Sequence, residues 1–312
     1  MAHRTTNIIM IIAAAAIMLS GCGETPPKTE KLSIVCSAFP QYDWTMQILK
    51  GTDSAELGLL NLKGKDMHSF LPTIADIAYA SSSDLYIYVG GESDIWSDHI
   101  IENTRNIRLM SVLEGRLRTV HHGEDDGHNH ENGYMADEHV WLSLKNTEVM
   151  IRAISDKICE IDKKNADIYR KNTEEYIAEL QKLDAEYEET AKNAERKTLI
   201  FADRFPFIYL TEDYGLDYCA AYNGCEAETE AGFDKVVMLA EKADEIKAPV
   251  ILKIENSDSA LANTVIENTK SKNQEVLVMD SCQSVSTDDY ANGKTYLSVM
   301  RGNLEVLKKA LN

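Results

Sequence analysis

A stretch of more than fifty residues, 144–197, contains neither glycine nor proline. These two residues interrupt helices more strongly than any others, so their absence over such a length favours helix. Apolar residues recur at roughly helical spacing, as at Ile154, Ile158 and Ile161, and charged residues occupy the other faces. The pattern predicts one long linking helix over 144–197. A break near 162–166, and a separate helical subdomain or coiled coil, remain open alternatives.

Short β-rich runs alternate with helical patterns on both sides of this stretch. Before it, the candidate strands are 32–36, 55–62, 85–89 and 107–112, with helical segments at 44–49 and 74–80. After it, the candidate strands are 198–201, 218–222, 250–254 and 275–279, with helices at 233–246, 259–269 and 296–311. Such alternation predicts mostly parallel sheets flanked by helices. The predicted fold is therefore α/β, with an N-terminal lobe over 32–143 and a C-terminal lobe over 198–312 joined by the long helix.

The first 22 residues are predicted to be a lipoprotein signal. Residues 8–19 form an uncharged apolar run of about a dozen residues, shorter than the about 20 that span a membrane. The run ends in Leu-Ser-Gly before Cys22, so cleavage is expected to leave Cys22 at the N-terminus for lipidation. The alternative is an ordinary signal peptide with a coincidental cysteine. Residues 23–31 are polar and contain proline, which predicts a tether rather than a packed element. Together with the lipoprotein signal, this tether predicts a protein that is anchored to the cell membrane and lies outside the cytoplasm.

Charge and cysteine content exclude several classes of function. The formal net charge of -19 argues against nucleic-acid binding, which requires basic patches. No CxxC motif occurs, so a redox motif or a structural zinc motif is not expected. Besides the cysteine assigned to lipid, an odd number of cysteines remains, so at least one has no disulfide partner within the chain. These are Cys36, Cys159, Cys219, Cys225 and Cys282.

Histidine placement is the most informative feature for function. Four histidines fall in a stretch without apolar residues and with two glycines: His121, His122, His128 and His130. We interpret the loop over 121–133 as an auxiliary metal-collecting loop, because imidazoles and carboxylates together bind ions such as Zn2+. A solvated polar loop without a metal is the alternative.

Two further histidines lie at predicted element boundaries. His68 follows the second candidate strand, at the edge where open α/β sheets bind ligands, and His139 follows the histidine-rich loop. His99 is expected on a surface helix. Two neutral imidazoles suit Zn2+ and leave Mn2+ open. Because each imidazole must lose its proton to bind, affinity is expected to fall as the pH drops through about 6.5.

Several motifs together resemble the zinc and manganese solute-binding proteins of ABC importers, the class with a long helix linking its lobes. They are the lipoprotein signal, a histidine before a proline in 64–72, LYIYVGGESDIW at 85–96, the histidine-rich loop followed by EHVWL at 138–142, and NADIY at 165–169. The resemblance covers essentially the whole mature chain. It implies capture of Zn2+, or Mn2+, outside the cytoplasm and delivery to an ABC importer permease in the membrane. It also implies a monomer without enzymatic activity.

The resemblance implies a ligand set residue by residue. His68 and His139 match the two N-lobe histidine ligands, and Asp280 matches the C-lobe carboxylate. The remaining family position matches Ala202, which cannot coordinate a metal. Asp203 is the tentative replacement, with Glu228, Glu230 or a water molecule as alternatives, while Glu255 matches a position that is usually structural.

Two other classes of function stay open. A zinc-dependent hydrolase needs an open metal site with a general base, but no HExxH motif occurs. A surface adhesin linked to metal binding is the second. No P-loop occurs either, as expected if separate subunits supply the ATPase.

Overall fold

The computed structural model describes residues 31–102, 104–121, 134–222 and 232–312. The chain divides into a segment Met1–Lys31 and a compact unit Leu32–Asn312, and every element named below belongs to the second. In the described ranges, no helix combines the length and the apolar content needed to cross a bilayer.

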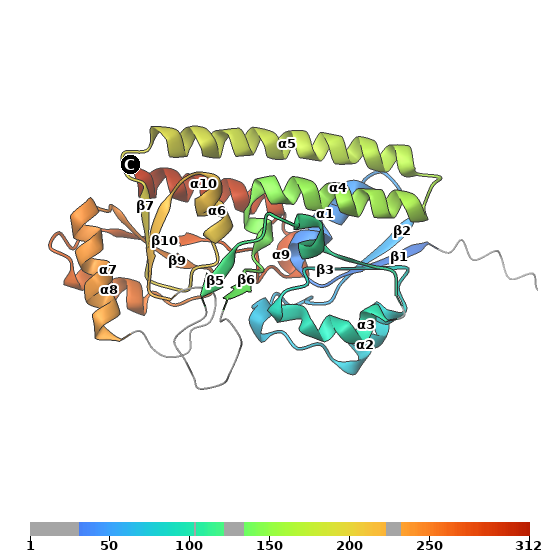
Figure 1. Ribbon diagram of the computed structural model, residues 1–312, viewed down its shortest axis with the longest axis horizontal. Coiled ribbons are helices and arrows are strands. Elements are labelled where there is room, and N and C mark those ends of the chain that lie inside the picture. Colours follow the sequence, from blue (N-terminus) through green and yellow to red (C-terminus); the bar gives the residue numbers. More distant parts are fainter. Residues whose placement is uncertain (1–30, 103, 122–133, 223–231) are drawn as a thin grey trace, which may run out of the picture. The chain divides into compact units, whose positions relative to one another are not determined.

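Two four-stranded parallel sheets organise this unit (Figure 1). The N-terminal sheet has the order β2-β1-β3-β4, with bounds β1 Leu32–Cys36, β2 Ala55–Leu59, β3 Leu85–Tyr88 and β4 Asn106–Arg108. The C-terminal sheet has the order β10-β9-β7-β8, with bounds β7 Thr198–Phe201, β8 Asp217–Ala220, β9 Val250–Ile254 and β10 Glu275–Met279. A short antiparallel pair follows the first sheet, β5 Thr119–His121 and β6 Tyr134–Ala136. The predicted α/β fold with two lobes is confirmed.

Helices cover both faces of the sheets, as the alternating pattern predicted. The α-helices are α1 Phe39–Leu49, α2 Ile74–Ser81, α3 Asp98–Ile101, α4 Leu144–Ile161, α5 Ala166–Asn193, α6 Ile208–Asp213, α7 Phe233–Ile246, α8 Ala260–Asn268, α9 Thr287–Ala291 and α10 Tyr296–Leu311. Short 3-10 helices are η1 Met67–Ser69, η2 Glu92–Ser97, η3 Leu109–Leu113 and η4 Val140–Leu142. The candidate strand at 107–112 is shorter than predicted, because the chain turns into η3 after Arg108.

The linking region differs from the single helix predicted over 144–197. It consists of two helices, α4 and α5, which lie side by side, and only α5 runs from one sheet to the other (Figure 1). The reversal occurs at Asp162, whose backbone is non-helical and whose carboxylate accepts hydrogen bonds from the Asn165 amide and the Tyr169 hydroxyl at 2.8 and 2.7 Å. An aspartate that satisfies local donors in this way competes with helix continuation. The open alternative of a break near 162–166 describes the chain correctly.

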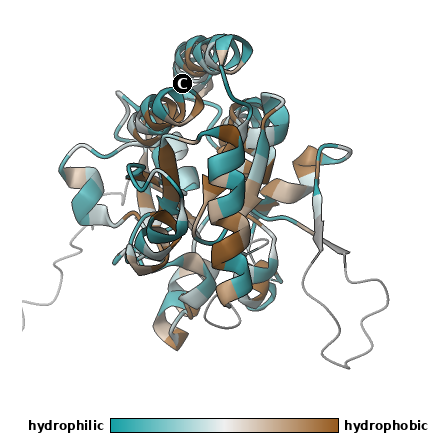
Figure 2. Cartoon of the chain, turned by 90° about the vertical axis from the view of Figure 1, so that its left-hand side faces the viewer, coloured by the Kyte–Doolittle hydropathy of each residue, from teal (hydrophilic) through white to brown (hydrophobic). Residues whose placement is uncertain are grey.

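Successive residues of each strand point to opposite faces of their sheet and so pack in different apolar cores. In β1, Ile34 and Cys36 face a large apolar core, whereas Val35 faces a smaller one beneath α2 and α3. In the second sheet, Phe201 faces the same large core, whereas Ile200 packs in a third cluster against α7 and α8. The large core therefore continues from one sheet to the other beneath α1, α4, α5 and α10. Figure 2 shows the strands as predominantly hydrophobic, with the outer side of α5 largely hydrophilic.

A buried carboxylate, Asp43, ties α1 to two other helices of this layer. Its side chain is fully buried, and it accepts hydrogen bonds from the Tyr176 hydroxyl of α5 and the first backbone N–H of α10, at Tyr296, both at 3.2 Å. The Gln47 amide donates a third at 3.5 Å. Burial raises the pKa of Asp43 to about 6, against the lowering effect of these hydrogen bonds.

This raised pKa predicts a pH-dependent stability. The folded state binds the Asp43 proton more tightly than the unfolded state, so the stabilisation is complete at acidic pH and is lost as the pH rises through about 6. Relative to Asp43→Asn, the unfolding free energy of the wild type should fall by about 2 kcal/mol between pH 4 and pH 8. Denaturant unfolding of both proteins across this range measures the difference. Asp167→Asn, which changes an exposed carboxylate, is the control and should show no such trend.

Candidate metal centre

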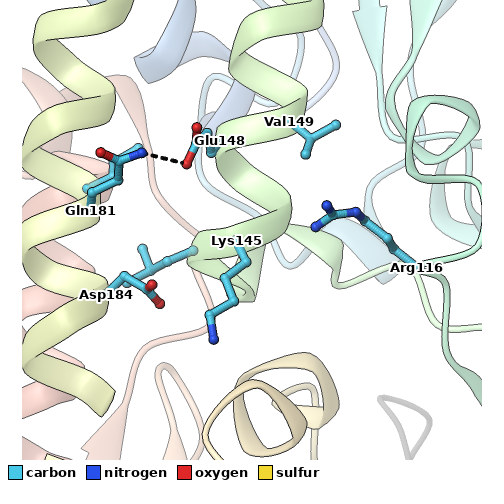
Figure 3. Close-up of a pocket in the computed structure, with 8 residues that line it drawn as sticks. Arg116, Lys145, Glu148, Val149, Gln181 and Asp184 are labelled. Carbon is cyan, nitrogen blue, oxygen red and sulfur yellow. Dashed lines mark hydrogen bonds between the residues drawn. The ribbon is translucent and has the colours of Figure 1, made fainter. Parts of the chain in front are cut away.

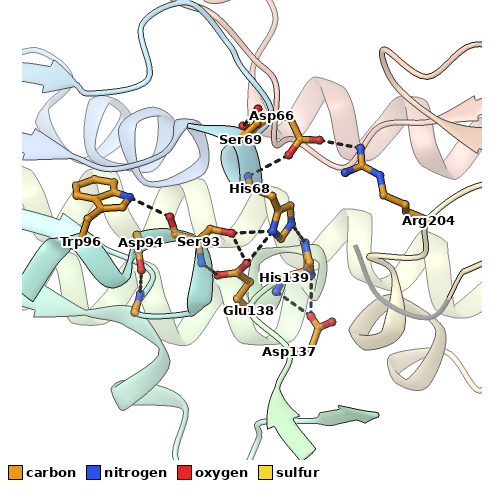
Figure 4. Close-up of polar contacts among 11 residues, drawn as sticks. Asp66, His68, Ser69, Ser93, Asp94, Trp96, Asp137, Glu138, His139 and Arg204 are labelled. Carbon is orange, nitrogen blue, oxygen red and sulfur yellow. Dashed lines mark hydrogen bonds and ion pairs between the residues drawn. The ribbon is translucent and has the colours of Figure 1, made fainter. Parts of the chain in front are cut away.

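Two imidazoles from distant parts of the N-terminal lobe meet at one point. The Nε2 atoms of His68, in η1, and His139, just before η4, lie 3.2 Å apart (Figure 4). Their rings are 5.3 Å apart between centroids and tilted by 43°. The side chain of His68 is 23% exposed, and that of His139 is 3% exposed. The pair therefore has one buried member and one member that solvent reaches.

His68 is oriented through its other ring nitrogen. Nδ1 lies 2.8 Å from the Ser93 hydroxyl oxygen and 3.3 Å from a carboxylate oxygen of Glu138. The backbone N–H of Ser93 donates to the second Glu138 oxygen at 2.9 Å, and its hydroxyl is in close contact with the first. Because an ionised carboxylate only accepts, the serine hydroxyl donates to Glu138 and accepts from the Nδ1–H of His68.

The loop that presents Ser93 depends on glycine. A Cβ on Gly91 would lie 2.2 Å from a carboxylate oxygen of Glu138, and Gly90 has a φ of 89°. Asp94 holds this loop by accepting the backbone N–H groups of Val89 and Gly90 at 2.8 and 3.0 Å. The two glycines of the 85–96 motif therefore let the serine approach both the carboxylate and the histidine.

His139 is oriented by Asp137, two residues before it. One carboxylate oxygen accepts the Nδ1–H of His139 at 3.0 Å and its backbone N–H at 2.8 Å. The ring also lies 5.2 Å from the ring of Trp141, whose Nε1 donates to the Ser281 carbonyl at 2.8 Å. This last contact connects His139 to the residue that follows Asp280 in the C-terminal lobe.

Both histidines therefore carry the proton on Nδ1, an assignment inferred from their hydrogen-bond partners. Their Nε2 atoms then face each other across 3.2 Å, a distance at which a shared proton or a metal cation can be held between them. With Zn–N bonds of about 2.0–2.1 Å, this separation corresponds to an N–Zn–N angle of about 100°, close to tetrahedral. Hydrogen bonding of the second ring nitrogen to a carboxylate is also the usual support of zinc-binding histidines. The pair fits Zn2+.

The acidic residues predicted as further ligands have other partners. Asp280 accepts the Lys294 ammonium at 2.7 Å and the Cys282 backbone N–H at 2.8 Å. Asp203 accepts two backbone N–H groups, from Arg204 at 2.8 Å and from Ile254 at 3.1 Å. Over the ranges that the structure describes, no three His, Cys, Asp or Glu side chains are grouped to hold a metal ion. Two of the four predicted ligands, the histidines, are brought together.

Two neighbouring positions have structural surroundings. Ala202 is buried in the apolar cluster beneath α7 and α8 and belongs to that packing. Glu255 accepts both the backbone N–H and the hydroxyl of Ser281, at 2.8 and 2.6 Å. Burial, and then the charge of Asp280, raise the pKa of Glu255.

An ion pair joins the two lobes beside the histidines. The carboxylate of Asp66 accepts the Arg204 guanidinium at 2.7 Å and, through its other oxygen, the His68 backbone N–H at 3.0 Å (Figure 4). Asp66 precedes η1, and Arg204 follows β7. Burial would raise the pKa of Asp66, but the hydrogen bond and charge of Arg204 hold it below its usual range. The loop that carries His68 is therefore tied to the C-terminal lobe.

Several predicted residues lie outside the part of the chain described in side-chain detail. They are Cys22, His121, His122, His128, His130, Cys225, Glu228 and Glu230. Of the remaining cysteines, Cys36, Cys159, Cys219 and Cys282 are free thiols. His99 lies in the short helix α3 and is exposed, as expected.

A cavity of about 340 Å³ lies elsewhere, where α4 faces α5. Its lining includes Arg116, Lys145, Glu148 and Asp184, and the Gln181 amide donates to Glu148 at 3.0 Å (Figure 3). Neither histidine of the pair lines it. The cavity is therefore separate from the candidate metal centre.

Sequence reasoning did not identify the supporting groups Asp137, Glu138 and Ser93. A local signal existed for Asp137, because a carboxylate two residues before a histidine is close enough to bond its ring. For Ser93 the signal is weaker, since its partners are 25 and 45 residues away along the chain.

Comparison with known families and proteins agrees with this geometry. The family model described as zinc-uptake complex component A periplasmic, ZnuA, matches residues 34–310. The chain is 30% identical over 315 residues to the high-affinity zinc uptake system protein ZnuA of Bacillus subtilis (strain 168), with 97% of each covered. It is 26% identical to the zinc-binding lipoprotein AdcA of Streptococcus pneumoniae (strain ATCC BAA-255 / R6), over 96% of this chain but 60% of AdcA.

Solved structures of similar fold belong to proteins of the same kind. The metal-dependent lipoprotein YcdH from Bacillus subtilis has a TM-score of 0.74 at 28% identity, covering 90% of this chain and 99% of YcdH. The Zn(II)-bound ZnuA-like domain of Streptococcus pneumoniae AdcA has a TM-score of 0.71 at 26% identity, with the same coverage. The predicted resemblance is confirmed.

The hydrogen bonds of His139 predict its tautomer. In the metal-free protein at alkaline pH, the proton should reside on Nδ1, because Asp137 accepts it. Asp137→Ala should move it toward Nε2, whereas Asp137→Asn should leave it in place, since the amide oxygen still accepts. Nitrogen-15 chemical shifts of the imidazoles measure this. A native His139 protonated on Nε2 would contradict the arrangement.

Proposed function

We propose that this chain, which belongs to the ZnuA family of periplasmic zinc-uptake components, captures Zn2+ outside the cytoplasm and delivers it to an ABC-type importer. The observation that carries the proposal is the pair of Nε2 atoms 3.2 Å apart, each histidine held by a carboxylate at its other nitrogen. An enzyme would also have to transform a substrate, whereas a carrier only binds and releases its ion.

The ligand set that we propose is His68, His139 and Asp280. Asp280 follows β10 at the same sheet edge from which Ser281 contacts Trp141, the neighbour of His139. Asp203, the tentative fourth ligand, would have to give up one of the two backbone N–H groups that it accepts. We therefore favour water, or a donor outside the described residues, for the remaining position. Imidazole nitrogens favour Zn2+ over Mn2+.

The partner that we propose is an integral-membrane permease, which receives the ion from a monomeric binding protein. The acidic, histidine-rich loop over 121–133 serves as an auxiliary collector, because its imidazoles and carboxylates bind Zn2+ weakly at several points. The chain spans 60% of the length of AdcA, so no function of the remainder of AdcA is inferred for it.

Removal of either histidine tests the site. His68→Ala and His139→Ala should each weaken Zn2+ binding by more than about 100-fold. Loss of a group that only orients a ligand already costs up to about 100-fold, and loss of the ligand itself should cost more. Competitive titration with a chelator of known affinity, after elemental analysis of the purified protein, measures this.

Two controls separate the tight site from other histidines. His99→Ala removes an exposed imidazole outside the pair and should leave the affinity unchanged. Deletion of 121–130 should also leave the tight site intact, and should slow uptake only at scarce metal. Unchanged affinity in His68→Ala would contradict the proposed site.

Lipid anchoring is proposed through Cys22, which follows the apolar run 8–19 and Leu-Ser-Gly. Expressed in a bacterial host, the wild type should remain in the membrane fraction and incorporate labelled fatty acid. Cys22→Ser should abolish the labelling, because only the thiol accepts the lipid. Label retained in the variant would show that this cysteine is not the attachment point.

A further inference from the structure

Asp280 is held by its surroundings except at one oxygen. Its backbone N–H and carbonyl are both bonded to the Asn303 side chain of α10, each at 2.8 Å. Its Oδ1 accepts the backbone N–H of Cys282 at 2.8 Å, and Cys282 has a φ of 62°, which turns the chain back over the carboxylate. Only Oδ2, which faces Lys294, can exchange its partner without rearrangement of the backbone.

Lys294 supplies a cation to that oxygen. Its Nζ lies 2.7 Å from Oδ2, and the side chains of Lys294 and Asp280 are 33% and 20% exposed. The lysine is in the short connection between α9 and α10, where its backbone N–H donates to the Asp289 carbonyl at 3.0 Å. An ammonium on a flexible four-carbon stem at a partly exposed position can withdraw into solvent while its backbone stays bonded.

The segment 281–295, which leads from β10 through α9 to α10 and carries Lys294, begins next to the histidine pair. The carbonyl of Ser281 accepts the Trp141 indole at 2.8 Å, and that indole lies against the His139 ring. Farther along, the Thr287 backbone N–H donates to the Leu62 carbonyl at 3.1 Å, in the loop that leads to His68. Segment 281–295 therefore touches the surroundings of both histidines.

A second carboxylate, that of Glu255, adds negative charge near Asp280. Glu255 bonds Ser281 through both of its oxygens and is close enough to Asp280 for their charges to interact. Without a cation, two like charges at partly buried positions would interact, which is unfavourable. Lys294 supplies a positive charge through its ion pair with Asp280, and a bound Zn2+ would supply it in its place.

We propose that Lys294 is a tethered cation that occupies Oδ2 of Asp280 in the metal-free protein and is displaced when Zn2+ binds. The inference rests on the proposed function and adds an affinity-setting residue to it. Lys294 competes with the metal for one oxygen, so it keeps the metal-free site folded and lowers the affinity for Zn2+. A carrier gains from this competition at release, because the ammonium returns to the oxygen that the ion leaves.

The test is the Zn2+ affinity of Lys294→Met, which keeps an apolar stem and removes the charge. The dissociation constant should decrease by about two- to fivefold, the range expected for loss of one partly exposed ion pair that opposes binding. Lys294→Arg, which keeps the charge, should stay at or above the wild-type value. Lys309→Met is the matched control, because it removes a lysine near Glu275, an exposed residue of β10, and should change nothing.

A double-mutant cycle separates competition from a general charge effect. In an Asp280→Asn background, Lys294→Met should have no further effect on affinity, because the contested oxygen is gone. Thermal unfolding gives a second readout: Lys294→Met should melt lower without Zn2+ and gain more on its addition. If Lys294→Met fails to fold, Lys294→Gln serves in the same comparison.

The outcomes are distinguishable. Weaker or unchanged Zn2+ binding in Lys294→Met, with a wild type that binds tightly, would overturn the competition and leave the proposed function standing. An effect of Lys294→Met that persists in the Asp280→Asn background would likewise overturn the competition alone. A wild type that binds no Zn2+ would overturn the proposed function and this inference together.

Discussion

The arrangement of the candidate metal centre depends on one apolar core that both sheets share. Alternate residues of β1, β3, β7 and β9 face this core, and α1, α4, α5 and α10 close it. Because interiors pack as densely as organic crystals, a shared core restricts the movement of one sheet against the other. The carboxyl edges of both sheets, from which the loops of His68, Arg204 and Asp280 emerge, are therefore fixed relative to each other. A domain-closure carrier with two separate cores would lack this constraint.

Within this shared core, the histidine pair is oriented so that its two Nε2 atoms meet. Carboxylates near both Nδ1 atoms direct the two Nε2 atoms toward each other, and over the described ranges no three His, Cys, Asp or Glu side chains form a complete metal site. The buried Trp141, which contacts both His139 and the backbone after Asp280, connects the two lobes at this point.

Periodicity in the sequence predicted the elements well, because burial decides them locally. The ranges 198–201 and 250–254 match β7 and β9, and 233–246 matches α7, since alternating or helical apolar patterns report which face is buried. The reversal at Asp162 was only an alternative, because it depends on side-chain bonds to Asn165 and Tyr169 that no periodicity contains. Residue pairs far apart in the chain were harder still. The sequence predicted His68 and His139 as ligands, but not that Ser93 would bond His68 or that Lys294 would hold Asp280.

The stiffness of the shared core also limits how the protein can respond to its ion. Hinge closure between lobes requires residues that absorb large backbone changes, but here α5 packs along both lobes and Asp66 bonds Arg204 across them. Changes confined to side chains meet no such resistance. Exchange of an ammonium for Zn2+ on one oxygen of Asp280 is a change of this kind, and it leaves the backbone bonds of Asn303 and Cys282 in place. In a carrier built on one core, release of the ion therefore depends more on which cation holds the carboxylate than on how far the lobes open.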